Sequence, residues 1–239
     1  MWNGKVVAVV LPTYNEHRSI ADCIRRFEAL GIVDEVVVVN NNAHPETTIE
    51  VSTTGAREVF EPVQGYGSAI QRGLDETGHA DLVVLCEPDG TFDPEDLWKL
   101  LPYTADVSIV FGSRTVQEFI LSGANMGTFL KWGNWAVAKL TEVLFNTVYL
   151  SDVGCTFRVL RRSAVDELRP EVTTLGSAFG FEMMLAAVKR RMPIVQIPVN
   201  YRERVGDSSV TGSRWKATVL GLDMIQMCIT HRLRPVRPR

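Results

Sequence analysis

The fold of this chain is decided by one stretch, Leu82-Val83-Val84-Leu85-Cys86-Glu87-Pro88-Asp89-Gly90-Thr91-Phe92-Asp93-Pro94-Glu95-Asp96. Its apolar beginning is too short for a helix and ends at two acidic residues, after which a glycine and a proline turn the chain. This pattern predicts a buried strand over Leu82 to Cys86 that delivers its last side chains to the edge of a sheet. Glu87 and Asp89 stand two positions apart, so their carboxylates point the same way on an extended chain.

Two carboxylates held side by side repel each other unless a cation or a proton lies between them. A hard divalent ion that also contacts phosphate oxygens is the simplest such partner. The pair therefore predicts a metal site. The alternative interpretation is a strand followed by an acidic first turn of a helix, without a metal.

The composition is that of a globular protein with a substantial core, because 46% of its 239 residues are hydrophobic and 22% are charged. A net charge of −3 argues against a general nucleic-acid binder, whose surface would be strongly basic. The cysteines are scattered without metal-binding spacing, which predicts reduced thiols in a cytoplasmic protein. They are Cys23, Cys86, Cys155 and Cys228. We recognise no signal sequence and no stretch long enough to span a membrane.

Strands and helices are expected to alternate through the first half of the chain. Strands are predicted at residues 5–11, 36–39, 58–61, 82–86 and 107–111, and helices at 20–30, 45–52, 65–78 and 94–101. This alternation predicts an α/β fold with parallel strands joined by right-handed crossovers.

Polar clusters follow four of these strands. They are Asn15-Glu16, Asn40-Asn41-Asn42, Glu87-Pro88-Asp89 and Gly112-Ser113-Arg114. In an open parallel sheet, ligands bind outside the carboxyl ends of the strands, so the clusters predict a shared site. Tyr14 can flank a nucleotide ring, and Glu16 and Asn40 can bond to a base or ribose, although Asn40 also suits a simple turn. Gly65-Tyr66-Gly67 lets the backbone approach an anion at a helix N-terminus.

The second half is less regular, with helices expected at 129–148, 181–191 and 215–231 and strands at 156–160 and 194–199. We find no repeat or linker, so one domain is expected over residues 1–239. Within it, residues 1–115 would form a nucleotide-binding half and residues 116–212 an acceptor-side half. Residues 213–239 would form a terminal helix and a basic tail.

Several short motifs occur in one order along the chain. They are Pro12-Thr13-Tyr14-Asn15-Glu16, the asparagine triplet, Gly65-x-Gly67, the Asp89-Gly90 loop, Gly112-Ser113-Arg114, residues 151–158, Phe181-Glu182 and residues 198–202. Together they resemble a family 2 glycosyltransferase with the GT-A fold, a Rossmann-like sheet flanked by helices. Within that family the chain is most similar to the polyprenyl-phosphate (dolichol-phosphate) mannosyl- and glucosyltransferases.

The resemblance implies a role for particular positions. The nucleotide-sugar donor would contact Pro12, Tyr14, Glu16, Asn40, Gly67, Glu87, Pro88, Asp89, Arg114 and Glu182. The family's Asp-x-Asp motif falls on Glu87-Pro88-Asp89, so Mg²⁺ or Mn²⁺ is expected on Asp89 and, directly or through water, on Glu87. The family usually has Asp where Asn40 stands.

The resemblance also implies the acceptor side. Arg114, Arg202, Arg204 and Ser208 would contact phosphate groups, and Asp152 begins the acceptor loop. The reaction would be a direct displacement with inversion, in which a divalent ion neutralises the leaving diphosphate. A phosphate acceptor needs only positioning, whereas a hydroxyl acceptor needs a base, for which Asp152 is the candidate. Asp152 and Asp89 are thus the expected catalytic residues.

Large apolar residues gather at Leu121 to Trp135 and along the terminal helix, which the arginine-rich tail follows. Such a helix with a basic flank predicts peripheral contact with a membrane surface. Core packing and the interface of a homodimer are the alternatives.

We therefore predict an inverting, metal-dependent hexosyltransferase that uses a nucleoside diphosphate sugar and a polyprenyl phosphate. A soluble hydroxyl compound is the alternative acceptor. From other classes, a sugar nucleotidyltransferase would need a Gly-rich loop with Arg and Lys after the first strand, which Pro12 to Glu16 does not provide. A non-catalytic nucleotide-sugar-binding module is the remaining alternative.

Overall fold

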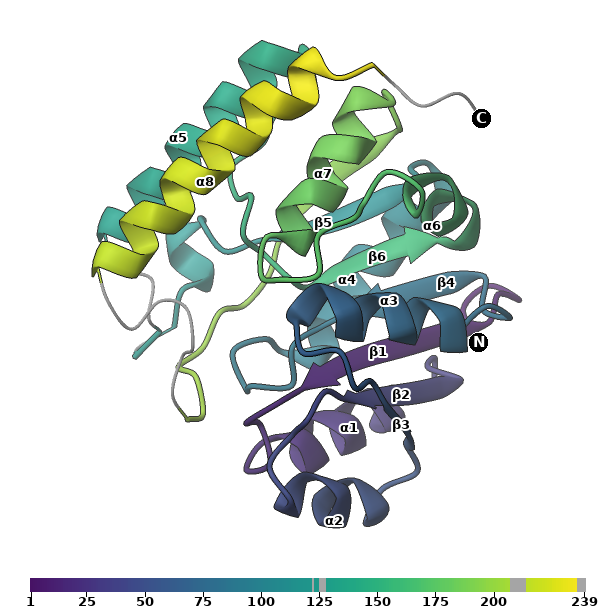
Figure 1. Ribbon diagram of the computed structural model, residues 1–239. Helices are drawn as coiled ribbons and strands as arrows, with labels where there is room; N and C mark the ends of the chain where they lie inside the picture. The colour runs from purple at the N-terminus through teal and green to yellow at the C-terminus, as the bar shows by residue number, and fades with distance from the viewer. Residues whose placement is uncertain (122, 125–127, 207–213, 236–239) are drawn as a thin grey trace.

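The computed structural model describes residues 1–121, 123–124, 128–206 and 214–235, which form one domain around a central sheet (Figure 1). The strands are β1 (Val7–Thr13), β2 (Glu35–Asn40), β3 (Arg57–Phe60), β4 (Leu82–Leu85), β5 (Ile109–Ser113), β6 (Arg158–Arg161) and β7 (Ile194–Pro198). Their order across the sheet is β3-β2-β1-β4-β6-β5-β7. The stretch that predicted a central buried strand is thus confirmed as β4, the middle strand of the seven.

Helices cover both faces of the sheet. They are α1 (Ile20–Ala29), α2 (Glu46–Ser52), α3 (Tyr66–Glu76), α4 (Leu97–Leu100), α5 (Thr128–Phe145), α6 (Arg162–Leu168), α7 (Phe179–Lys189) and α8 (Arg214–Leu233). Helices α1 and α4 pack on one face, and α3, α6 and α7 pack on the other. Helices α5 and α8 lie side by side and form an outer layer against α7 (Figure 1).

The buried strands explain why the sequence pattern is so clear. Strands β1 and β4 have their side chains buried on both faces, so each appears as a continuous apolar run rather than an alternation. Val9 and Val84 join the core on the α1 side, and Val10 and Leu85 join the core on the α3 side. All four cysteines are buried and unpaired, as predicted for reduced core thiols.

Strand β6 departs from the expected parallel arrangement, because it runs antiparallel between β4 and β5. It begins at Arg158, opposite Leu85 and Phe111, and therefore starts where its neighbours end. The loop that precedes it, residues 151–157, is consequently held at the carboxyl edge of the sheet. This reversal brings the second half of the chain to the polar clusters of the first half.

The sequence was less successful at two helices. The helix expected at 94–101 is a four-residue α4 between 3₁₀ turns at Pro94–Asp96 and Leu101–Ala105. Pro102 in the second turn has no backbone N–H to donate, which ends the α-helix before it. Helix α6 was not predicted, since its seven residues are too few to show a period. Among the described residues, no helix is both long enough and apolar enough to cross a membrane.

Two helical glycines lie in opposite surroundings, which gives a test of the packing. A Cβ on Gly73 of α3 would lie 2.2 Å from Cγ1 of Val10, whereas a Cβ on Gly133 of α5 would meet no atom within 4 Å. Gly73→Ala should lower the free energy of unfolding by about 1–3 kcal/mol, the cost of overpacking a core. Gly133→Ala should raise it by roughly 0.5–1 kcal/mol through helix propensity. Urea denaturation measures both, and equal effects would contradict the packing of α3 on β1.

Candidate active site

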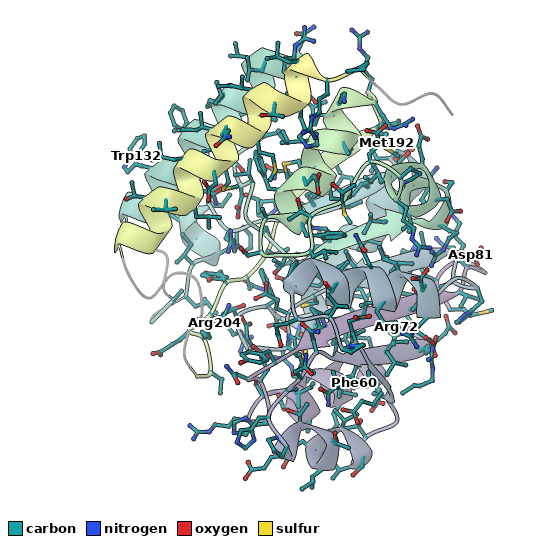
Figure 2. The ribbon with its side chains drawn as sticks, viewed as in Figure 1. Phe60, Arg72, Asp81, Trp132, Met192 and Arg204 are labelled. Atoms are coloured by element: carbon teal, nitrogen blue, oxygen red, sulfur yellow. The ribbon has the colours of Figure 1, made fainter. Side chains whose placement is uncertain are left out.

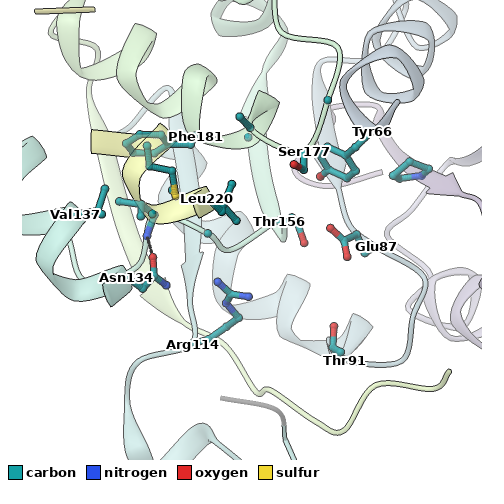
Figure 3. A pocket seen from close by; sticks show the side chains of 18 of the residues that line it. Tyr66, Glu87, Thr91, Arg114, Asn134, Val137, Thr156, Ser177, Phe181 and Leu220 are labelled. Atoms are coloured by element: carbon teal, nitrogen blue, oxygen red, sulfur yellow. Dashed lines mark hydrogen bonds between the residues drawn. The ribbon is translucent and has the colours of Figure 1, made fainter. Parts of the chain in front are cut away.

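A cavity of about 730 Å³ opens at the carboxyl edge of the sheet (Figure 3). The loop after β1, Glu87 after β4 and Arg114 after β5 form its polar part. Helices α5, α7 and α8 form the rest, with Val137, Phe181 and Leu220 among the lining side chains. Figure 3 shows these apolar groups on the side away from Glu87, with Arg114 below them. The cavity therefore has a polar end and an apolar end.

The two acidic residues converge as the sequence predicted. Asp89 is fully buried, and its Oδ1 accepts hydrogen bonds from the amide (2.9 Å) and the hydroxyl (2.5 Å) of Thr91. Its Oδ2 accepts no hydrogen bond within the described chain and lies 2.5 Å from one guanidinium nitrogen of Arg204. The same nitrogen lies 3.1 Å from Oε2 of Glu87. The carboxylates thus share one cation.

Burial, followed by the charge of Asp89, raises the pKa of Glu87 to about 7. The pKa of Arg204 is raised as well, because Asp89 and Glu87 outweigh the opposing effect of its burial. The buried oxygens of Glu87 and Asp89 are hard donors that face one point, which suits Mg²⁺ or Mn²⁺. Their direct ligation of a metal stays a prediction.

The loop after β1 is organised by Glu16. Its Oε2 accepts hydrogen bonds from the Thr13 hydroxyl (3.2 Å) and from the amides of Tyr14 (2.7 Å) and Asn15 (2.9 Å). This bonding gives the loop its shape and leaves Tyr14 exposed over 46% of its surface at the cavity. Pro12 also lines the cavity. Contact of these residues with a nucleotide base remains a prediction.

The neighbour of the predicted asparagine lines the cavity instead. Asn40 is engaged at the sheet edge, where its amide donates to Glu58 (2.8 Å) and its oxygen accepts from the Ala43 amide. Asn41 lines the cavity, and its oxygen accepts from the amide of Gly65 (2.8 Å). One member of the asparagine triplet thus lines the cavity, but spacing alone did not show which one.

Five of the ten predicted donor contacts do not line the cavity, namely Asn40, Gly67, Pro88, Asp89 and Glu182. The Gly67 amide donates to the Leu175 carbonyl (2.8 Å), so a peptide oxygen lies at the N-terminus of α3. Glu182 accepts from the amides of Thr173 (3.0 Å) and Thr174 (2.7 Å). Although burial opposes it, bonding to His231 and Thr174 lowers the pKa of Glu182 to about 2. In this structure Gly67 and Glu182 hold the 173–175 segment against α3 and α7. Their direct contact with a donor stays a prediction.

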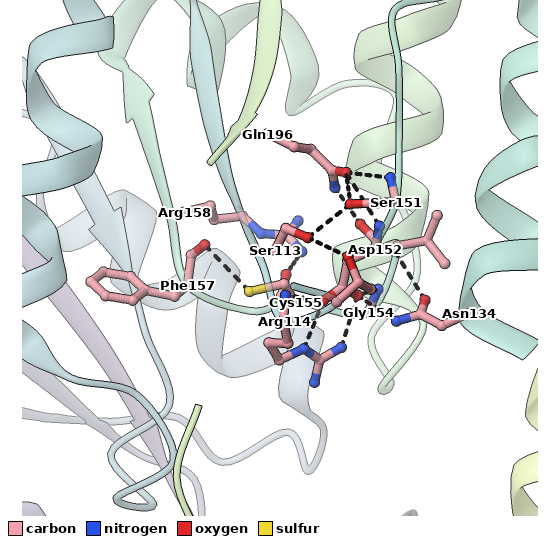
Figure 4. A network of polar contacts seen from close by, with 12 residues as sticks. Ser113, Arg114, Asn134, Ser151, Asp152, Gly154, Cys155, Phe157, Arg158 and Gln196 are labelled. Atoms are coloured by element: carbon pink, nitrogen blue, oxygen red, sulfur yellow. Dashed lines mark hydrogen bonds and ion pairs between the residues drawn. The ribbon is translucent and has the colours of Figure 1, made fainter. Parts of the chain in front are cut away.

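Asp152 lies in a dense network with Arg114 (Figure 4). Its carboxylate accepts from the Arg114 amide (2.8 Å), Nε (2.8 Å) and Nη2 (2.9 Å), and also from Asn134 (2.5 Å) and the Gly154 amide (2.9 Å). Burial alone would raise the pKa of Asp152, but Arg114 lowers it to about 2. A carboxylate with this pKa and five donors is a poor base, so the structure does not support the role of base that we predicted. Asp152 instead fixes Arg114 at the cavity wall.

The remaining predicted residues fall into three groups. Pro88 does not line the cavity, and its carbonyl accepts from the Ser19 hydroxyl (2.6 Å). Arg202 forms an ion pair with Asp93 and lies outside the cavity lining, unlike Arg204, and its phosphate contact stays a prediction. Ser208 lies outside the described residues.

A buried guanidinium was missed from the sequence. Arg158 at the start of β6 is 1% exposed and donates to the carbonyls of Gly180 (2.7 Å) and Cys155 (2.5 Å). These bonds tie α7 to the loop before β6, and Arg158 also lines the cavity. The sequence offered no signal for this role, because the partner Gly180 lies 22 residues away.

Comparison with known proteins agrees with this architecture. The family model described as glycosyl transferase family 2 matches residues 8–169. Low-salt glycan biosynthesis hexosyltransferase Agl6 of Haloferax volcanii is 29% identical over 211 residues, covering 85% of this chain and 49% of that protein. A dolichyl-phosphate hexose transferase of the same organism is 26% identical over 230 residues, covering 95% and 96%. The chain thus spans about half of the first relative and nearly all of the second.

Among solved structures, glucosyl-3-phosphoglycerate synthase from Mycobacterium tuberculosis, in complex with Mn²⁺, uridine diphosphate and phosphoglyceric acid, superposes with a TM-score of 0.76. The two are 20% identical, and the match covers 97% of this chain and 80% of that one. This likeness shows a common fold, the GT-A fold expected from the sequence. Together with the family match it leads to one conclusion: this chain is a glycosyltransferase and belongs to glycosyltransferase family 2.

Proposed function

We propose that this enzyme is an inverting, divalent-metal-dependent hexosyltransferase that transfers a sugar from a nucleoside diphosphate to a polyprenyl phosphate. One observation carries the proposal: a single cavity joins a polar end, lined by Glu87 and Arg204, to an apolar passage between α5, α7 and α8, and Arg114 lies on its wall. A donor with a charged diphosphate and an acceptor with a phosphate on a lipid chain match these two ends.

The polar end suits the donor. Tyr14, Asn41 and Glu87 lie along this part of the wall, where a base, a ribose and a metal-bound diphosphate can be held in sequence. Mg²⁺ or Mn²⁺ on Asp89 and Glu87 would neutralise the charge that develops on the leaving diphosphate. Arg204 supplies a second positive charge at the same place.

The protonation of the site favours an acceptor that is already an anion. Glu16 and Glu87 are the carboxylates that line the described part of the cavity, and both face the donor end. Asp152, with its low pKa, is held by Arg114. A phosphate acceptor needs no base, only a guanidinium to position it, and Arg114 is fixed for that role.

The outer face of α5 and α8 supports a position on a membrane surface, at the cytoplasmic side. Trp132 points outward from α5 and is 66% exposed (Figure 2), and Leu222 and Ile229 of α8 are exposed as well. Basic residues follow at Arg232 and Arg234. An apolar face with a basic end suits an anionic lipid surface. A homodimer interface is the competing use of this face.

The second candidate is transfer to a soluble hydroxyl compound. The structure of glucosyl-3-phosphoglycerate synthase, a protein of the same fold, is a complex with phosphoglyceric acid, a soluble molecule. The apolar end of the cavity in this chain favours the lipid.

Donor binding can be tested by thermal unfolding with a panel of nucleoside diphosphates, with and without Mn²⁺. One nucleotide at about a hundred times its Kd should add roughly 2.7 kcal/mol of stability, and only when the metal is present. Asp89→Asn should abolish this shift, because it removes a ligand charge. Asp106→Asn, an exposed control, should keep the shift. Stabilisation of Asp89→Asn equal to wild type would contradict the metal site.

The role of Asp152 can be separated from that of a base. Asp152→Asn should lower kcat by about tenfold or more, because Arg114 loses its charged partner in a site that depends on fixed charges. The shape of the pH–rate profile should stay the same, since no proton passes through Asp152. Loss of the low-pH limb of the profile in the variant would instead show that Asp152 is the base.

The role of the apolar end can be tested with two tryptophan substitutions on α5. Ala136 lines the cavity, whereas Val143 on the same helix is 81% exposed and lies outside it. Ala136→Trp should raise KM for polyprenyl phosphate by about tenfold or more through steric exclusion, with unchanged nucleotide binding. Val143→Trp should leave KM unchanged. Equal KM values in both variants, or transfer only to a soluble hydroxyl compound, would overturn the lipid acceptor.

A further inference from the structure

Arg204 lies where a divalent cation would be expected. One of its guanidinium nitrogens is 2.5 Å from Oδ2 of Asp89 and 3.1 Å from Oε2 of Glu87. Asp89 is fully buried and the side chain of Arg204 is 25% exposed, so water screens these charges only weakly. The protein therefore supplies its own cation to the acidic pair.

The backbone that carries Arg204 is fixed to the acidic loop. The Arg202 amide donates to the Thr91 carbonyl (2.8 Å), and the Val205 amide donates to the Asp89 carbonyl (2.9 Å). A Cβ on Gly90 would lie 2.9 Å from Cγ2 of Val205, so the two segments are in close contact. The guanidinium can leave the carboxylates by a side-chain rotation, without moving these segments apart.

A guanidinium and a divalent ion cannot occupy one point between the same oxygens. Their like charges repel at short range, most strongly where burial keeps the dielectric low. A metal that binds Asp89 must therefore displace the guanidinium of Arg204. Because Arg204 also lines the cavity, the displaced guanidinium remains beside the donor end, where a diphosphate offers it several oxygens.

We propose that Arg204 holds the place of the metal in the donor-free enzyme and moves onto the diphosphate when metal and nucleotide bind together. The inference rests on the metal-dependent donor site of the proposed function. It has a thermodynamic consequence that the donor site alone does not require. The metal alone binds weakly because it must break two ion contacts. The nucleotide offers the guanidinium new partners, so each ligand tightens the binding of the other.

The test is a titration with Mn²⁺ followed by the electron paramagnetic resonance signal of the free ion, with and without uridine diphosphate, and with guanosine diphosphate in parallel. Arg204→Gln should bind Mn²⁺ alone about tenfold more tightly than wild type, since no internal cation competes. The factor by which nucleotide tightens Mn²⁺ binding should shrink in the same variant. Arg72→Gln, on α3 and paired with Glu76 outside the cavity, should behave like wild type.

Arg204→Lys serves as a second variant that keeps the positive charge. It should bind Mn²⁺ alone less tightly than Arg204→Gln, because an ammonium still competes for the carboxylates. This inference would be overturned if Arg204→Gln bound Mn²⁺ alone no more tightly than wild type does. If wild type still bound Mn²⁺ together with a nucleotide, the proposed donor site would remain intact. Absence of Mn²⁺ binding from every variant, with either nucleotide, would overturn the proposed function as well.

Discussion

The repulsion between two buried carboxylates is the constraint on which the rest of the site depends. Strand β4 ends in the middle of the sheet, where Asp89 has no access to water. Like charges in such a place require hydrogen-bond donors and a cation. Thr91 provides the donors and Arg204 the cation, and the segment that carries Arg204 is therefore bound to the loop. The arrangement of the proposed donor end therefore follows from the need to stabilise these two charges.

The antiparallel direction of strand β6 determines which part of the chain lies next to the proposed donor end. Because β6 starts at the carboxyl edge, the loop before it brings Asp152 to Arg114, and Arg158 ties α7 to the same loop. A parallel strand at this place would begin at the opposite edge and carry the loop away from β4 and β5. The position of the proposed acceptor side thus follows from the direction of a single strand.

The sequence predicted the features that depend on residues close together in the chain. It did not predict contacts that depend on a partner far away in the chain. The buried runs of β1 and β4 and the convergence of Glu87 with Asp89 follow from local spacing, and the structure confirms them. The burial and bonding of Asp152 depend on Arg114 and Asn134, which lie 38 and 18 residues away. No period in the sequence encodes such pairings.

The division of the cavity wall has a consequence for how enzymes of this architecture diverge. The polar end is built from loops that follow the strands, whereas the apolar end comes from α5, α7 and α8. Helices α5 and α8 form the outer layer, so mutations there can reshape one end with little effect on the acidic pair. Evolution can therefore exchange one acceptor for another while the donor chemistry is inherited unchanged.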